Sequence, residues 1–570
     1  MVTVNVDRGR RFARRGVSLC AIALIIACGS EPPRDTPVRG PAPTKPSPEQ
    51  ITNAERLLTG PDWYRHAVFY EVNVRSFQDS NGDGIGDLAG LTSRLDYLKD
   101  LGIDALWLMP IFPTGFKDSG YDIADYRAID PAYGDLAAYD TLVREAHARK
   151  MRVFQDLVLN HTSALHAWFQ ESRKDKTNPK ADWYLWSDTP SRADLGTCQP
   201  DNPRFGTGWS KDEPRGQYFF HRFYAEQPDL NYRNPEVVKE TLDVARFWLA
   251  RGTDGFRCDV IGKLFESPAG CDMLPETIAY IQKLRAVLDE GARGGATPGT
   301  TTHAAMVGEP SELNDSTKYY GNGSDMFHMT FDFGFGYFWQ LAFGARDRKI
   351  IDDAIKTSLV YPKGAQPAQV IGSHDVPRAW QYTANEPWRQ RNAALLSMTL
   401  RGTPFVYYGD ELGMQTGSQV VVDDRDASRT PMIWTSAGAG HGFTTGNPWI
   451  AFSGAAEQTA VDVEDADPAS MLTYYRQLLA FRRGHAVWGT GDVQLVSLDV
   501  SSVVAFVRAD ATEKLLVVVN LTDEDQEAFD GAAAIGSSAE LVFGDGTADV
   551  AGGAVKVKIP AKAAAIFQVR

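Results

Sequence analysis

The chain has 570 residues and a formal net charge of −15 at pH 7, with 43% hydrophobic and 23% charged residues. This composition excludes a disordered or fibrous protein and indicates a packed soluble body, too long for one ordinary domain. The acidic balance argues against nucleic acid as a partner, because an acidic surface repels phosphate backbones.

The first 28 residues have the pattern of an export signal. A basic segment that ends at Arg15 precedes an apolar run, residues 17–27, which is too short to span a bilayer. The run ends Ile-Ile-Ala-Cys-Gly and resembles a bacterial lipoprotein processing site, so we expect a lipidated Cys28 to tether the mature chain to a membrane. Alternatives are an ordinary cleaved signal and a twin-arginine signal at Arg10 and Arg11. In each case we expect export, as a cell-surface or periplasmic lipoprotein or as a secreted protein.

Residues 29–60 form a Pro-rich linker, and after it apolar runs alternate with amphipathic stretches. Eight of these runs read as buried parallel strands: residues 67–72, 105–109, 151–157, 255–260, 304–307, 326–331, 368–371 and 404–408. Helical patterns lie between several of them, at residues 91–101, 136–150 and 235–251. The alternation predicts an α/β fold, a closed (β/α)8 TIM barrel over residues 61–485.

Two segments depart from this alternation. Residues 161–234 follow the third strand without steady helical periodicity and predict an inserted subdomain. Residues 486–570 alternate like strands and predict a C-terminal all-β domain, a β-sandwich. Cys198 and Cys271 could pair in an oxidising compartment and leave Cys258 buried, but three thiols allow three pairings.

Acidic residues stand at successive strand ends, which is where barrels of this kind carry their chemistry. Asp259 ends the fourth strand, Glu309 ends the fifth, and Asp375 follows the seventh. Cleavage of a glycosidic bond needs one ionised and one protonated carboxyl group. Arg257 shares a strand face with Asp259, so we expect it to keep this nucleophile ionised. Glu309 follows an apolar strand, which predicts a raised pKa and a general acid/base.

The remaining polar residues at this mouth complete the predicted site. Asp375 would be a third carboxylate near the developing positive charge, and His161 and His374 would donate hydrogen bonds to sugar hydroxyls. Any single acid here could instead cap a helix. Acids at successive strand ends favour the catalytic interpretation.

These segments resemble the signature regions of the α-amylase family, glycoside hydrolase family thirteen, and occur in the family's order. Residues 102–110, 121–126, 402–411 and 429–434 also resemble family segments. The resemblance runs from about Trp63 to the C-terminus and implies a retaining hydrolase of α-glucans. It further implies that Tyr121 stacks on the sugar at the cleavage point, and that Asp122 and Arg429 form an ion pair closing the pocket.

A loop after the first strand has the pattern of a calcium site. Its oxygen ligands alternate with glycines, and they would be Asp79, Asn81, Asp83, the Ile85 carbonyl and Asp87. Family members with this loop bind Ca²⁺ there, which implies a structural ion. The alternative is a polar turn without metal.

Features within the family disagree on the narrower activity. Gln227 and Val260 resemble the oligo-1,6-glucosidase group, whereas Ser373 and Ile433 depart from it, and an export signal favours polymer processing. Our first hypothesis is an α-amylase-type hydrolase of α-1,4 bonds in starch or malto-oligosaccharides. Alternatives are an exo-acting α-glucosidase or oligo-1,6-glucosidase, a sugar isomerase or transglycosylase, and a non-catalytic glucan-binding protein.

Overall fold

The computed structural model describes residues 56–196, 198, 205–293, 303–311, 316–336, 339–362, 364–422 and 424–570. The expected export signal with Cys28, and nearly all of the Pro-rich linker, lie outside these residues. Within the described part of the chain, no helix combines the length and the apolar character needed to cross a membrane.

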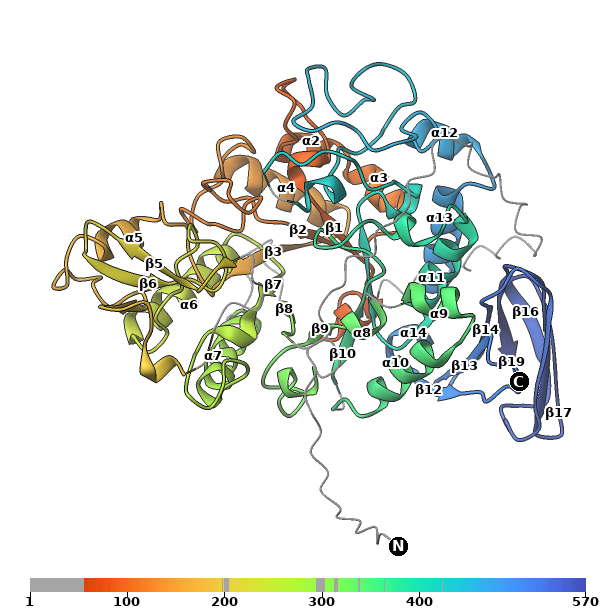
Figure 1. Ribbon diagram of the computed structural model, residues 1–570. Helices are drawn as coiled ribbons and strands as arrows, with labels where there is room; N and C mark the ends of the chain where they lie inside the picture. The colour runs from red at the N-terminus through yellow and green to blue at the C-terminus, as the bar shows by residue number, and fades with distance from the viewer. Residues whose placement is uncertain are drawn as a thin grey trace, which may run out of the picture. The chain divides into compact units, whose positions relative to one another are not determined.

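Eight parallel strands close into a barrel, in the spatial order β1-β11-β10-β9-β8-β7-β3-β2 (Figure 1). Their bounds are β1 (Phe69–Val72), β2 (Ala105–Leu108), β3 (Arg152–Val158), β7 (Gly255–Asp259), β8 (Ala305–Gly308), β9 (Met329–Phe331), β10 (Gln366–Gln369) and β11 (Thr403–Tyr407). The predicted (β/α)8 barrel is confirmed. The seventh strand begins two residues earlier than predicted, because Gln366, a polar residue, pairs in register with Met329 of β9.

Helices follow most of the strands. They are α2 (Leu88–Ser93), α3 (Leu95–Leu101), α4 (Leu136–Ala148), α6 (Pro235–Ala250), α7 (Pro275–Arg293), α8 (Phe333–Gly336), α9 (Trp339–Ala345), α10 (Lys349–Leu359), α11 (Pro387–Thr399), α12 (Val461–Ala466), α13 (Met471–Gly484) and α14 (Val487–Thr490). Local sequence sets several helix starts. The Asp135 carboxylate accepts from the Ala138 N–H at the start of α4, and Asn234 with Pro235 begins α6. The helix predicted over 91–101 is two helices, broken at Arg94.

Aromatic side chains fill the barrel interior. Phe69, Trp107, Phe154, Phe331 and Phe405 belong to one buried cluster. The rings of Phe69 and Phe405 stack with centroids 4.4 Å apart. Flat rings from β1, β2, β3, β9 and β11 therefore take the place of many of the branched aliphatic side chains that are common in such barrels.

The segment between β3 and α6 forms a small subdomain. It contains α5 (Ala167–Ser172) and an antiparallel sheet of β4 (Trp186–Ser187), β6 (Gln217–Phe220) and β5 (Trp209–Asp212). A disulfide joins Cys198 of this subdomain to Cys271, beyond the end of β7, and Cys258 is buried and free. Of the three possible pairings, the structure therefore contains Cys198–Cys271.

The C-terminal strands form two antiparallel sheets, in the orders β12-β13-β14-β19-β16 and β15-β18-β17 (blue in Figure 1). Their bounds are β12 (Asp492–Leu495), β13 (Val503–Ala509), β14 (Lys514–Asn520), β15 (Gln526–Asp530), β16 (Ala539–Gly544), β17 (Thr547–Ala551), β18 (Ala554–Ile559) and β19 (Ala564–Val569). Arg508 of β13 is fully buried and donates to the Thr399 and Leu400 carbonyls at the end of α11, at 2.8 Å each. The partial negative charge of a helix C-terminus suits this buried cation.

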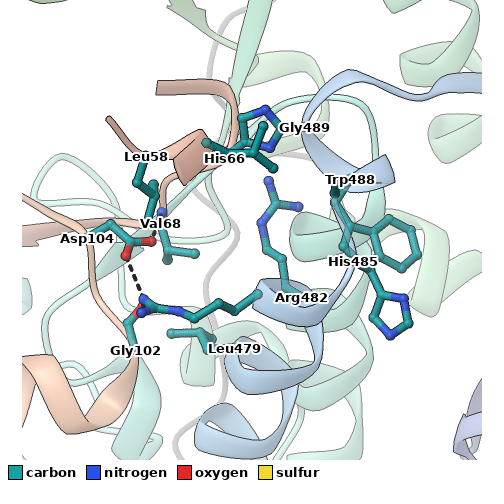
Figure 2. A pocket seen from close by; sticks show the side chains of 13 residues that line it. Leu58, His66, Val68, Gly102, Asp104, Leu479, Arg482, His485, Trp488 and Gly489 are labelled. Carbon is teal, nitrogen blue, oxygen red and sulfur yellow. Dashed lines mark hydrogen bonds and ion pairs between the residues drawn. The ribbon is translucent and has the colours of Figure 1, made fainter. Parts of the chain in front are cut away.

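Residues of α13 and α14 also contact the barrel at the amino ends of its strands. A cavity of about 20 Å³ lies there. Figure 2 shows its lining, which includes His66, Asp104, Arg482 and Trp488. Arg483 of α13 pairs with Asp104 at 2.5 Å. His66 lies shortly before β1 and Asp104 directly precedes β2, so this cavity is at the opposite end of the barrel from the predicted chemistry.

Candidate functional site

Five carboxylates lie at or just beyond the carboxyl ends of the barrel strands. Glu71 lies on β1, Asp156 on β3 and Asp259 at the end of β7, and Glu309 and Asp375 follow β8 and β10. Glu71, Asp156 and Asp259 are buried, whereas the side chains of Glu309 and Asp375 keep 16% and 25% of their surface exposed. The barrel therefore brings together the three acids predicted to be catalytic, with two further acids behind them.

Arg257 stands at the centre of this group. Its Nη1 donates to Asp259 Oδ1 at 2.6 Å and to Asp156 Oδ1 at 3.0 Å, and its Nη2 donates to Glu309 Oε2 at 2.8 Å. The predicted nucleophile and the predicted acid/base thus bond to the two ends of one guanidinium. This arrangement fixes the orientation of both carboxylates before any substrate arrives.

Val260 adds a second contact to Glu309. Its φ of 35° places a β-branched residue in the left-handed region, where such residues are genuine outliers. Its backbone N–H donates to Glu309 Oε2 at 2.9 Å. Strain of about 1–3 kcal/mol at such a position persists only where the surroundings impose it.

The pKa values of these acids depend on burial and on shared cations. Burial raises the pKa of Asp259 to about 7 and that of Glu309 to about 7, in both cases against the opposing charge of Arg257. Burial of Asp375 is outweighed by its interactions with His374, Arg425 and Arg429, and its pKa lies below the usual range.

One expectation is corrected here. Arg257 does not by itself keep Asp259 ionised, because one guanidinium is shared among Asp156, Asp259 and Glu309. Three carboxylates around one cation hold a proton near neutral pH. A retaining glycosidase needs that state, with one protonated and one ionised carboxyl group at the bond.

His374 and Tyr121 form one wall of the site. Their rings stack with centroids 5.3 Å apart, and the Tyr121 hydroxyl lies 2.8 Å from His374 Nε2. The hydroxyl also donates to Asp156 Oδ2 at 2.9 Å, and His374 Nδ1 lies 2.5 Å from Glu71 Oε1. His374 is therefore held on both ring nitrogens.

His161 lies deeper than expected for a sugar ligand. It is 1% exposed, and its Nε2 lies 3.1 Å from the Tyr121 carbonyl oxygen and 3.2 Å from Gln227 Nε2. Its ring nitrogen is thus engaged by protein groups, although the residue stands beside the predicted stacking tyrosine.

The pocket-closing ion pair was predicted between Asp122 and Arg429, and this prediction is wrong. Asp122 Oδ1 accepts from the Thr114 hydroxyl at 2.6 Å inside its own loop, and Arg429 Nε donates to the His374 carbonyl at 3.1 Å. Asp122 and Arg429 are both described, and no ion pair joins them. Asp122 is held inside its own loop, whereas Arg429 lies against the segment after β10, with its Nη2 3.8 Å from Asp375 Oδ1.

Arg425 takes the expected role instead. It pairs with Asp118 and, at 2.6 Å, with Asp375, and Asp118 Oδ2 also accepts from Gln227 Nε2 at 3.1 Å. Two loops of the barrel and the inserted subdomain are thereby linked across one side of the site. We call this linkage, Asp118–Arg425–Asp375, the pocket bar.

Four residues of the site were missed from the sequence. Glu71 and Asp156 occupy barrel strands, so their strand positions were a usable signal. Asp118 and Arg425 lie on loops and carry no local pattern that distinguishes them from other charged loop residues.

The predicted calcium loop is folded around its own backbone. Asp79 accepts from the N–H groups of Asn81, Gly82 and Gly84 and from the Thr444 hydroxyl. Although burial opposes them, these hydrogen bonds lower the pKa of Asp79. In the part of the chain that the structure describes, no three His, Cys, Asp or Glu side chains converge as a metal site.

The other loop oxygens follow the same pattern. Asn81 Oδ1 accepts from Asp83 N at 2.9 Å, Asp83 Oδ1 accepts from Ile85 N at 2.8 Å, and Asp87 caps α2. Each such bond uses one of the two lone pairs of its oxygen. These oxygen atoms therefore suit a hard cation as ligands, but the loop holds its shape through its own hydrogen bonds.

Comparisons with known proteins place this geometry in context. The family model described as "Alpha amylase, catalytic domain" matches residues 71–491. The trehalose synthase/amylase of Mycobacterium tuberculosis is 37% identical over 538 residues, which cover 86% of this chain and 87% of that protein. A probable alpha-glucosidase of Rhizobium meliloti is 36% identical, over 83% of this chain and 92% of its own length.

Solved structures agree with these relatives. An alpha-glucosyl transfer enzyme superposes with a TM-score of 0.77 at 33% identity, over 89% of this chain and 99% of its own. The trehalulose synthase of Pseudomonas mesoacidophila MX-45 superposes with a TM-score of 0.77 at 30% identity, over 90% of this chain and 100% of its own.

Proposed function

Because this chain belongs to the α-amylase family and is a glycoside-acting enzyme, we propose that it removes single α-glucosyl units from chain ends. The acceptor would be water or a sugar hydroxyl. The pocket bar is the observation that carries the proposal, because an ion-paired linkage across one side of the site leaves room for a chain end and blocks a continuing glucan. This reading favours an exo-acting α-glucosidase or transglucosidase over our first hypothesis of an α-amylase.

The acids support a retaining mechanism. Asp259 would attack the anomeric carbon while Glu309 gives a proton to the leaving oxygen, and the bond between the two sugars would break. Glu309 would then take a proton from the acceptor as it attacks the glucosyl-Asp259 bond, which restores the free carboxylate. Asp375, held ionised beside Arg425, would stabilise the positive charge of the transition state.

A second candidate within this reading is isomerisation of a disaccharide. The observation that favours it is the 37% identity to a protein named trehalose synthase/amylase across most of both chains. The same covalent intermediate serves both reactions, and they differ in whether the released glucose or water attacks it.

One time course would test these alternatives. We would incubate the enzyme with maltose, isomaltose, trehalose and maltoheptaose and follow the earliest products. Glucose or new disaccharides from the start would support exo action, and trehalose from maltose would support isomerisation. Maltotriose and maltotetraose as the first products of maltoheptaose would overturn the proposal.

We also propose that Ca²⁺ binds the loop of Asp79, Asn81, Asp83, Ile85 and Asp87 as a structural ion. Supporting this, side-chain oxygens recur at alternate positions and Asp79 has a lowered pKa. Bound Ca²⁺ would neutralise the loop's acids and stiffen the first strand-to-helix connection.

Finally, we propose that the chain is exported and anchored through a lipid on Cys28. The supporting pattern is the basic segment, the short apolar run and the cysteine that follows it. Radioactive palmitate labelling in the native host would test this, with Cys20→Ser as the matched control for Cys28→Ser. Equal labelling of the two variants would overturn the proposal.

A further inference from the structure

A continuous line of hydrogen bonds runs behind the site from Glu71 to Asp156. Glu71 Oε1 lies 2.5 Å from His374 Nδ1, His374 Nε2 lies 2.8 Å from the Tyr121 hydroxyl, and this hydroxyl donates to Asp156 Oδ2 at 2.9 Å. Glu71, Asp156 and His374 are at most 2% exposed. These groups are shielded from bulk solvent, so the protein groups around them determine where each proton sits.

The proton on His374 Nε2 follows from its neighbours. The only hydroxyl proton of Tyr121 points to Asp156, so the Tyr121 oxygen can only accept from His374. The Asp375 carboxylate lies 3.4 Å from the same nitrogen, and its negative charge also favours a proton there. The Tyr121 oxygen, as an acceptor, therefore requires an N–H at Nε2, which assigns the tautomer.

The contact between Nδ1 and Glu71 then needs a second proton. A neutral His374 with its proton on Nε2 has a bare Nδ1, which accepts, so Glu71 must be the donor as a carboxylic acid. The other possibility is an imidazolium facing an ionised Glu71. Both states hold the same number of protons. They differ in whether the proton of the 2.5 Å contact lies on Glu71, which leaves both groups neutral, or on His374, which charges both.

Burial decides between these states. Removal from water raises the pKa of Glu71 well above its usual value and lowers the pKa of His374 well below its own. Both effects favour the uncharged pair, since a buried ion pair loses more hydration than a neutral one. Besides Tyr121, the charged and titratable groups that face the pair are Arg257, Asp375, Asp156, Tyr407, Arg429 and Arg425.

We propose that Glu71 is a positioning residue that stays protonated and donates its carboxyl proton to His374 Nδ1. This bond keeps the proton of His374 on Nε2, where it donates to the Tyr121 hydroxyl and fixes this wall of the pocket. The role of the wall in sugar binding rests on the proposed function, whereas the position of the proton does not. A carboxylic acid kept neutral by its surroundings can act as such a donor.

Substitution of Glu71 separates the two proton arrangements. Glu71→Gln keeps a donor, because its amide N–H can bond to Nδ1, so kcat at pH 7 should stay within about tenfold of the wild type. Glu71→Leu removes the donor and frees the ring to take the other tautomer, so kcat should fall about 10- to 100-fold, with a smaller change in KM. The alternative state, an ionised Glu71 facing a His374 imidazolium, predicts the opposite result for Glu71→Gln. The neutral amide would no longer stabilise the imidazolium, and most of kcat would be lost.

The pH dependence of kcat/KM distinguishes this role from a purely structural one, because a structural role of Glu71 would leave its slope unchanged. Above the pKa of Glu309, log kcat/KM of the wild type should fall with a slope of one. It should then fall with a slope of two, once the Glu71–His374 pair loses its proton and Nε2 becomes an acceptor. Glu71→Gln lacks that proton, so its slope should stay at one. Glu411→Gln is the matched control, since Glu411 is also buried but bonds to tyrosine hydroxyls.

A measurement without turnover tests the inference independently of the proposed function. Nitrogen NMR of histidine-labelled enzyme, with His374 assigned by loss of its signals in His374→Gln, distinguishes an Nε2–H tautomer from an imidazolium. A neutral Nε2–H ring at pH 7 in both the wild type and Glu71→Gln is the expected result. An imidazolium in the wild type would overturn the proposal, and an enzyme inactive on every glucoside would instead count against the proposed function.

Discussion

Removal of Arg425 is the most direct test of the pocket bar. The guanidinium of Arg425 pairs with Asp118 and with Asp375, and Arg425 and Asp375 keep 20% and 25% of their side chains exposed. Charge-assisted hydrogen bonds contribute about 1.5–3 kcal/mol each to the free energy of the arrangement that they hold. We take the lower figure here, because solvent screens partly exposed charges. Loss of both in Arg425→Ala therefore costs about 3 kcal/mol, or roughly 100-fold in kcat/KM.

The same variant should change the products as well as the rate. Without the bar, longer glucans can pass the pocket, so maltoheptaose should release maltose and maltotriose early, measured by chromatography of short digests. Asp118→Asn should show the same broadening with a smaller loss of rate, because Asp375 keeps its partner. Arg389→Ala, which removes an ion pair of similar exposure away from the site, is the matched control. A wild-type rate and product pattern in Arg425→Ala would refute the reasoning.

Four further results are expected. Asp259→Asn should abolish turnover while maltose binding by calorimetry survives; measurable steady turnover would contradict its role as nucleophile. Because burial raises the pKa of Glu309 to about 7, the general acid is protonated below that pH, so kcat/KM should decline as the pH rises above about 7. Loss of the Cys198–Cys271 disulfide, whose partners are 73 residues apart, should cost about 4 kcal/mol by urea unfolding with and without reductant. Chelation should lower Tm in the wild type but not in Asp83→Ala, and equal shifts would argue against the calcium loop.

The barrel and its catalytic candidates could be predicted because both depend on local pattern. Apolar runs of strand length, repeated with helices between them, have few folded solutions other than a barrel. Asp259 and Glu309 stand directly at strand ends, and Arg257 shares a strand face with Asp259 because side chains alternate along a strand. These relations span few residues, so they can be read along the chain.

The contacts that define the pocket depend on residues far apart in the chain. Glu71 is 303 residues from His374, and Asp118 is 307 from Arg425, so neither pair leaves a spacing pattern. Arg425 and Arg429 lie one helical turn apart on the same loop, and only its folded path selects which of them reaches Asp118. The sequence alone determined that the strands form a barrel and that Asp259, Glu309 and Asp375 stand at or after their ends. Tertiary structure decided how charges and protons are shared among them, because burial and loop path set those energies.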